Sequence, residues 1–285
     1  MTFLAIIIAV LLLQVWGTAE RTHRDGWLAG WQARVAGWAL PDGIGLALLV
    51  LLPALVVSLL LGMLKPILFG LLWLPLAALV LLYSFGRGDF QASMGRYRGH
   101  AYSGDFEAAY LAACEEFGWE VAADSAPDTA PEVHAMIQRA LLYEGLQRWF
   151  TVLFYFALLG PAGALVYRLL QLELGASQGM LAARWLFLLD WLPSRLLAAT
   201  FTLTGDFISS RDSLLSGLQN GWLQADELLY TVGLAALGPD TALPGGEEDA
   251  MIGPAAAAQN REFEALLSRS AVCWILVLSL LVLLF

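Results

Sequence analysis

Charged side chains are scarce in this sequence: they make up 14% of its 285 residues, whereas soluble globular domains average about 25%. Lysine is almost missing, because Lys65 is the only one and arginine supplies the remaining basic residues. A phosphate-binding P-loop requires a lysine followed by serine or threonine, but Lys65 precedes Pro66. The formal net charge of −10 repels polyanions. We therefore exclude P-loop chemistry and nucleic-acid binding.

Cysteine and histidine are also rare. Neither Cys114 nor Cys273 has another cysteine or a histidine at metal-ligand spacing, so we expect two small buried side chains without a disulfide. His23, His100 and His134 stand alone, and we expect them on exposed or helix-surface positions. The sequence therefore predicts no metal site and no catalytic residue.

Apolar runs are abundant, since 59% of the residues are hydrophobic. A helix needs about 20 mostly apolar residues to cross a hydrocarbon core of about 30 Å. Several runs reach or approach that length, so the sequence predicts an all-α, polytopic helical membrane protein that forms a single membrane domain over 1–285. About six hydrophobic spans are expected, near 2–16, 44–64, 66–85, 149–170, 185–205 and 271–285.

Two of these spans contain unusual residues. The span 149–170 is interrupted at Gly160–Pro161, which a membrane helix tolerates where a neighbouring helix satisfies the freed carbonyls. The span 185–205 carries Asp190 and Arg195, so it crosses only if these groups face protein or water. If it does not cross, the polar stretch that follows it changes side.

The basic residues predict an orientation. With six spans, the polar stretches 17–43, 86–148 and 206–270 lie on one side of the membrane and hold 11 of the 15 basic residues, whereas Lys65 and Arg184 lie on the other. The positive-inside rule then makes the three polar stretches cytoplasmic.

Helical patterns continue within the cytoplasmic stretches. The segment 103–119 places apolar residues at helical spacing, and Thr129-x-x-Glu132 is typical of a capping box that begins a helix. The segment 213–237 predicts a further amphipathic helix. Each apolar stripe must dock on something, so we expect these stretches to be folded.

Charged residues gather near the predicted cytoplasmic membrane face. Ionisable groups at that depth are costly, usually paired and typical of functional sites, and arginines suit an anionic ligand. The alternative is that they are structural ions and ordinary interface charges, and both interpretations stay open. The candidate ligand-binding residues are Arg87, Asp89, Glu144, Asp190, Arg195, Arg211 and Asp212.

The order of the spans and several motifs resemble the AmpE family over essentially the whole chain. The most specific motif is Phe85–Asp89 (FGRGD), and Gly160–Arg168 (GPAGALVYR) and Asp190–Arg195 (DWLPSR) agree with it. The resemblance implies a protein of the bacterial inner membrane, typically encoded beside a cytoplasmic amidase of cell-wall recycling, that modulates β-lactamase induction. The candidate partners are then the lipid bilayer, a cytoplasmic protein of cell-wall recycling and a second copy of the chain.

AmpE is in turn similar to the membrane-bound cobinamide-phosphate synthases, which are amide ligases of cobalamin assembly. Glu144 and the Pro-x-Arg motif at Pro193 and Arg195 are retained from that family. Other polar positions of the family are replaced, by Gly145, Leu146, Arg148, Gln171, Leu172 and Leu174. These replacements argue against ligation, which needs groups that bind nucleotide and metal.

Two functions of different classes therefore stay open. The preferred one is a regulatory protein without a cofactor, either non-enzymatic or with residual activity, which binds an anionic ligand or a partner at its cytoplasmic face. The alternative is a membrane amide ligase of the cobinamide-phosphate synthase type, which alone would need a nucleotide with magnesium. A transporter would need an inverted repeat, and the sequence shows no internal repeat.

Overall fold

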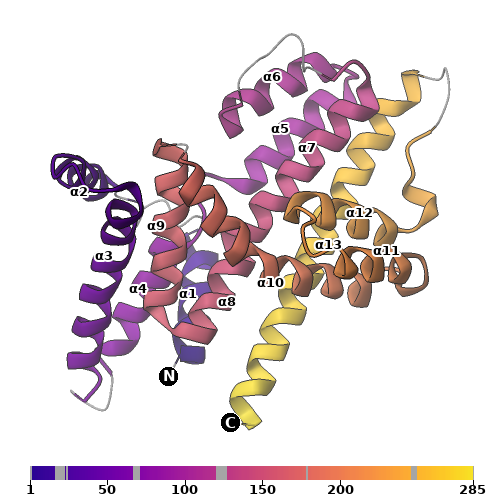
Figure 1. Ribbon diagram of the computed structural model, residues 1–285. Coiled ribbons are helices and arrows are strands. Elements are labelled where there is room, and N and C mark those ends of the chain that lie inside the picture. Colours follow the sequence, from indigo (N-terminus) through magenta and orange to yellow (C-terminus); the bar gives the residue numbers. More distant parts are fainter. Residues whose placement is uncertain are drawn as a thin grey trace. The chain divides into compact units, whose positions relative to one another are not determined.

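The computed structural model describes residues 2–16, 23, 25–66, 71–119, 127–177, 179–244 and 249–284, and every regular element in these ranges is a helix (Figure 1). Among the described residues, three helical segments are long and apolar enough to cross a membrane: α3 (Asp42–Leu64), α10 (Met180–Thr204) and Ile252–Leu280 of α13 (Asp249–Leu284). The predicted class, a helical membrane protein, is confirmed.

The chain divides into two compact units, where the sequence predicted a single membrane domain. Unit 1 comprises Met1–Gly88, Gln147–Pro193 and Leu278–Phe285, and unit 2 comprises Asp89–Leu146 and Ser194–Val277. Amphipathic helices bury their apolar stripes on one another and can form a core of their own. A count of apolar runs does not detect such a core, because its residues are dispersed along polar stretches.

Unit 1 has a core in which short apolar helices pack closely. The helix α1 contacts α4, and Ala5, Ala9, Ala77 and Ala78 are fully buried, because small side chains let two helix backbones approach. The helix expected over 66–85 begins only at Trp73 in the described residues. The helices of unit 1 are α1 (Thr2–Trp16), α2 (Gly26–Ala36), α3, α4 (Trp73–Ser84), the π-helix η3 (Leu146–Phe150), α8 (Thr151–Leu159), α9 (Pro161–Ser177) and the first part of α10.

Unit 2 has a separate core that includes Met94, Ile137, Leu141, Phe201 and Phe263. Its predicted capping box is confirmed, because the Glu132 carboxylate accepts the backbone N–H of Thr129 at 3.3 Å. The single helix expected over 213–237 is two helices. The helices of unit 2 are α5 (Phe90–Tyr102), α6 (Phe106–Phe117), α7 (Ala130–Gly145), the second part of α10, α11 (Phe207–Gln219), α12 (Ala225–Leu237), the 3-10 turn η4 (Pro239–Thr241) and most of α13.

His134 departs from the surface position that the sequence predicted, since it is fully buried in unit 2. Its Nε2–H donates to Gln259 Oε1 at 2.6 Å, its Nδ1 accepts from the Tyr97 hydroxyl, and the Gln259 amide donates to Thr241 O at 2.7 Å. Burial lowers the pKa of His134 to about 4. The imidazole is therefore a neutral structural bridge between α5, α7 and α13.

The helix predicted over 149–170 is not continuous. It is a hairpin of α8 and α9 that turns at Gly160, where φ is +75°. Tyr155 stacks on Tyr167 with ring centroids 5.9 Å apart, so the two helices run back along each other. Counted from the start of η3, the first arm reaches only about 20 Å at 1.5 Å per residue, which is short of the roughly 30 Å hydrocarbon core.

Candidate functional site

The hairpin returns to the end of unit 1 from which it started. The Gln171 amide of α9 donates to Gln147 Oε1 of η3 at 2.7 Å, and Gln32 of α2 donates to Glu173 at 2.7 Å. We call this the polar end of unit 1 and define it by Asp25, Gln32, Arg87 and Glu173. The six-span topology places the segment after residue 170 opposite the stretch 17–43, whereas Glu173 contacts Gln32 in the structure. The topology itself stays a prediction.

A buried polar link joins two opposite charges at this end. The Arg168 Nε donates to Ser84 O at 2.7 Å, and its Nη1 donates to the side-chain oxygen of Gln171. The Gln171 amide donates to Gln147, and the Gln147 amide donates to Asp190 Oδ2 at 3.0 Å. Arg168 and Asp190 are 3% and 1% exposed. We call this chain of residues the Arg168–Asp190 link.

The Asp190 carboxylate is satisfied from several elements. Tyr167 of α9 donates to its Oδ1 at 2.7 Å, and Thr151 of α8 lies 3.4 Å from the same oxygen. A carboxylate accepts these bonds in its ionised form, and a buried charge is stable only when it is paired and hydrogen-bonded. The link therefore holds α4, η3, α9 and α10 in one arrangement.

The FGRGD segment wraps around Arg148. The Arg148 guanidinium donates to Gly88 O at 2.7 Å and to the carbonyl of Arg87, while Gly86 N–H donates to Arg148 O at 3.2 Å. A Cβ on Gly86 would lie 2.2 Å from Arg148 Cγ, so this position has no room for a side chain. The most specific motif of the sequence thus shapes a loop that is fitted to one arginine.

The Arg87 side chain closes this loop onto α2. It forms a bidentate ion pair with Asp25, with nitrogen–oxygen distances of 2.9 and 2.8 Å, and Tyr83 donates to Asp25 Oδ1 at 2.8 Å. Burial raises the pKa of Asp25, but the hydrogen bonds from Arg87 and Tyr83 outweigh it and hold this pKa below its usual value. Burial and then the positive charge of Arg87 lower the pKa of His23 to about 4. Arg87 is thus already paired within the chain.

A cavity of about 1070 Å³ lies at the polar end, where Gln32 and Glu173 line it. It lies between α2, the start of α3, the end of α9 and the start of α10, and its polar lining includes Gln32, Asp42, Glu173 and Arg184. Arg184 is exposed. The cavity gives the polar end a concave surface that carries groups of both charges.

The predicted site residues do not form one cluster within either unit. In unit 1, Arg87 belongs to the ion pair and Asp190 to the Arg168–Asp190 link. The other five belong to unit 2. Asp89 caps α5 through the backbone N–H groups of Gln91 and Ala92, and Glu144 is half-buried on α7. Arg195 is buried and donates to the carbonyls of Asn220, Gly221 and Leu223. Arg211 and Asp212 are exposed.

Sequence reasoning missed Asp25, Gln147, Tyr167, Arg168 and Gln171. Arg168 carried a usable signal, because an arginine within an apolar run is costly unless it is paired. The two glutamines carried none, since neutral polar residues are common in helices. Among the described residues, no group of three or more His, Cys, Asp or Glu lies close enough to hold a metal ion.

The comparisons with known proteins agree with the motifs. The family described as regulatory signalling modulator protein AmpE matches residues 1–221. No curated protein and no solved structure matches the chain. The family match spans both arms of the hairpin, the FGRGD loop and the whole of α10. Because it covers well over half of the sequence, the chain belongs to the AmpE family of regulatory signalling modulators.

Proposed function

We propose that this protein modulates β-lactamase induction from the bacterial inner membrane, by binding an anionic ligand or a protein partner of peptidoglycan recycling at the polar end of unit 1. The family assignment supports a regulatory role. The ligand or partner, the pathway and the cytoplasmic orientation of this end are parts of the proposal.

The Arg168–Asp190 link carries the proposal. Desolvating two charges costs several kcal/mol each, and breaking a buried pair by removing one partner costs roughly 3–5 kcal/mol. Membrane proteins keep such groups mainly where they serve a function. The link ties the hairpin to α4 and α10, so a molecule that competes for one of its hydrogen bonds changes how these helices are held.

The adjoining cavity offers a place for such a molecule. Its volume of about 1070 Å³ is at the upper end of the roughly 300–1,000 Å³ typical of small-ligand sites. Arg184 supplies a guanidinium for an anion, and Gln32 and Glu173, which line the same cavity, hydrogen-bond each other. Binding there would act directly on α2 and α9, and through α9 on Gln171 of the link.

The test uses inducible resistance in a host whose β-lactamase induction depends on this protein. Asp190→Asn removes the charge of the link, and Arg184→Gln removes the exposed cation of the cavity without disturbing a buried contact. Asp128→Asn is the matched control, since it makes the same chemical change at an exposed position that belongs neither to the link nor to the candidate ligand-binding residues. We expect the first two variants to alter induction at unchanged membrane abundance and the control to behave as wild type.

Normal induction by Arg184→Gln and Asp190→Asn, at normal protein levels, would refute the proposal. A separate assay addresses the ligase alternative: the purified protein is incubated with ATP, magnesium and an adenosylated corrinoid. Turnover that is lost in Glu144→Gln would favour the ligase, because Glu144 is a position retained from the synthase family.

A further inference from the structure

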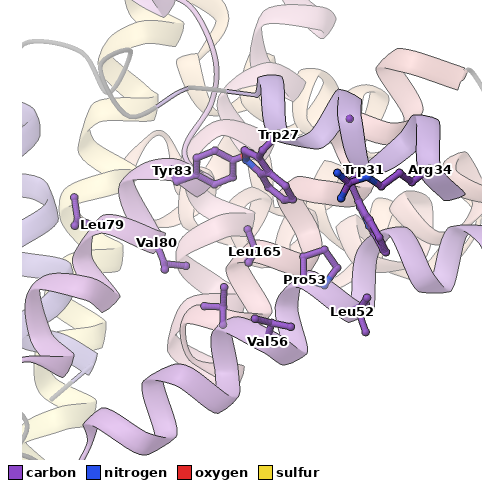
Figure 2. A pocket seen from close by; sticks show the side chains of 12 residues that line it. Trp27, Trp31, Arg34, Leu52, Pro53, Val56, Leu79, Val80, Tyr83 and Leu165 are labelled. Carbon is purple, nitrogen blue, oxygen red and sulfur yellow. The ribbon is translucent and has the colours of Figure 1, made fainter.

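A second cavity of unit 1 is lined mainly by apolar side chains. It has a volume of about 770 Å³ and lies between α2, α3, α4 and α9. Figure 2 shows Trp27, Trp31 and Arg34 of α2 above the apolar side chains of α3 and α4. We call it the α2 groove. It is distinct from the cavity that contains Arg184, and its lower wall includes Leu52, Pro53, Val56 and Val80.

The α2 groove covers part of one leaflet of a membrane. Its lining on α3 spans Leu52 to Val57, which is about 8 Å at 1.5 Å per residue, whereas half of a hydrocarbon core is about 15 Å. A segment of one acyl chain therefore has apolar wall on α3 and α4, and the rest of the chain lies in the bilayer.

The mouth of the groove carries one positive charge. Arg34 is exposed and lines the groove, and Figure 2 shows its guanidinium turned back toward Trp31. In the described part of the chain, no carboxylate lies within ion-pair distance of Arg34, and the groove lining contains no acidic side chain. An anionic group at the mouth would pair with Arg34 and would not be repelled by an acidic side chain of the groove lining.

Trp31 adds an unsatisfied donor. Its indole Nε1 is buried and has no hydrogen-bond partner within the described residues. A buried donor without a partner costs about 1–3 kcal/mol. Trp31 lines the groove together with Arg34, so a phosphate or ester oxygen would relieve this cost once the indole turns its N–H into the groove, and an apolar chain alone would not.

Gly30 lines the groove and has open space beside it. Glycine in a helix interior costs about 1 kcal/mol relative to alanine, yet a Cβ on Gly30 would meet no atom within 4 Å. Close packing therefore does not demand a glycine at this position of α2. Its small size leaves free volume in the wall of the groove.

We propose that the α2 groove is a site for one anionic membrane phospholipid. Its phosphate binds Arg34 and accepts the Trp31 indole N–H, and one acyl chain lies along α3 and α4. The site would let the protein respond to the anionic lipid around it, and it does not depend on the ligand or partner proposed for the polar end.

The test measures lipid retained by the full-length protein, purified in mild detergent, by native mass spectrometry. Phosphatidylglycerol is the anionic probe and phosphatidylcholine the zwitterionic one. We expect one phosphatidylglycerol to be retained at least tenfold more strongly than phosphatidylcholine. Arg34→Gln should remove this preference. Gly30→Phe should lower retention of both lipids, because its ring fills the path of the acyl chain.

Arg269→Gln is the matched control, since Arg269 is an exposed arginine that precedes the apolar end of α13. It should retain phosphatidylglycerol as the wild type does. Equal retention of the two lipids by the wild type, or an unchanged preference in Arg34→Gln, would overturn the proposal. A dimer that Gly30→Phe abolishes, with no retained lipid, would assign the groove to a second copy of the chain and would also overturn it.

Discussion

The side of the membrane on which Arg184 lies distinguishes the hairpin from a crossing helix. Arg34, Lys65 and Arg184 are all exposed, and each is replaced singly by cysteine in a background where Cys114 and Cys273 are alanine. Intact cells and inverted vesicles are then treated with a membrane-impermeant maleimide. We expect the cysteines at positions 34 and 184 to react from the same side and the one at position 65 to react from the opposite side.

The distances that separate the three labelled positions follow from the helix lengths. The 23 residues of α3 separate Lys65 from the polar end by about 34 Å, which exceeds the hydrocarbon core of about 30 Å. By contrast, Gln32 and Glu173 are joined by a 2.7 Å hydrogen bond, and Arg184 follows Glu173 by 11 residues. Reaction of position 184 from the side of position 65 would refute the hairpin and restore the six-span topology.

Two further predictions concern stability, measured by thermal unfolding in detergent. His134 is neutral when folded, with a pKa of about 4 against 6.5 when unfolded. Its contribution to the free energy of unfolding is therefore complete above about pH 6.5 and falls as the pH drops toward 4, with about 2 kcal/mol lost by about pH 5. His134→Gln should remove this loss, and an unchanged pH dependence in that variant would contradict the buried, neutral state of His134. Gly86→Ala should lower the free energy of unfolding by about 1–3 kcal/mol, because its Cβ clashes with Arg148. Gly95→Ala, on an exposed face of α5 with open space around it, should not destabilise the protein. Equal effects of the two variants would show that the FGRGD loop accommodates a Cβ at position 86 by moving.

Part of the candidate site was predictable from single residues. Asp190 was predicted as a site residue because a carboxylate in an apolar run must have partners. Gln147 and Tyr167 are two of these partners. Its distant counter-charge, Arg168, was not predicted, because two glutamines connect the pair and nothing in their spacing marks them. Arg87 was identified as a site residue, but its partner Asp25 lies 62 residues away, at the N-cap of α2.

The hairpin shows how a local signal was misread. Gly160 followed by Pro161 is typical of one helix ending and another beginning, since glycine favours the end of a helix and proline its first turn. The total length of the apolar run suggested a crossing helix instead. Length alone does not separate these cases, because a hairpin of two short arms has the same composition as one span.

The sequence by itself determined the helical membrane class, the family and several helix starts. These depend on the length of apolar runs and on contacts within a few residues, because lipid leaves backbone groups no partner except their own helix. Only the tertiary structure decided that the fourth apolar run doubles back and that Arg168 is connected to Asp190 through Gln171 and Gln147. It also decided that the Arg148 side chain occupies the space beside Gly86. These features depend on how helices far apart in the chain are rotated and packed, which apolar periodicity and spacing do not encode.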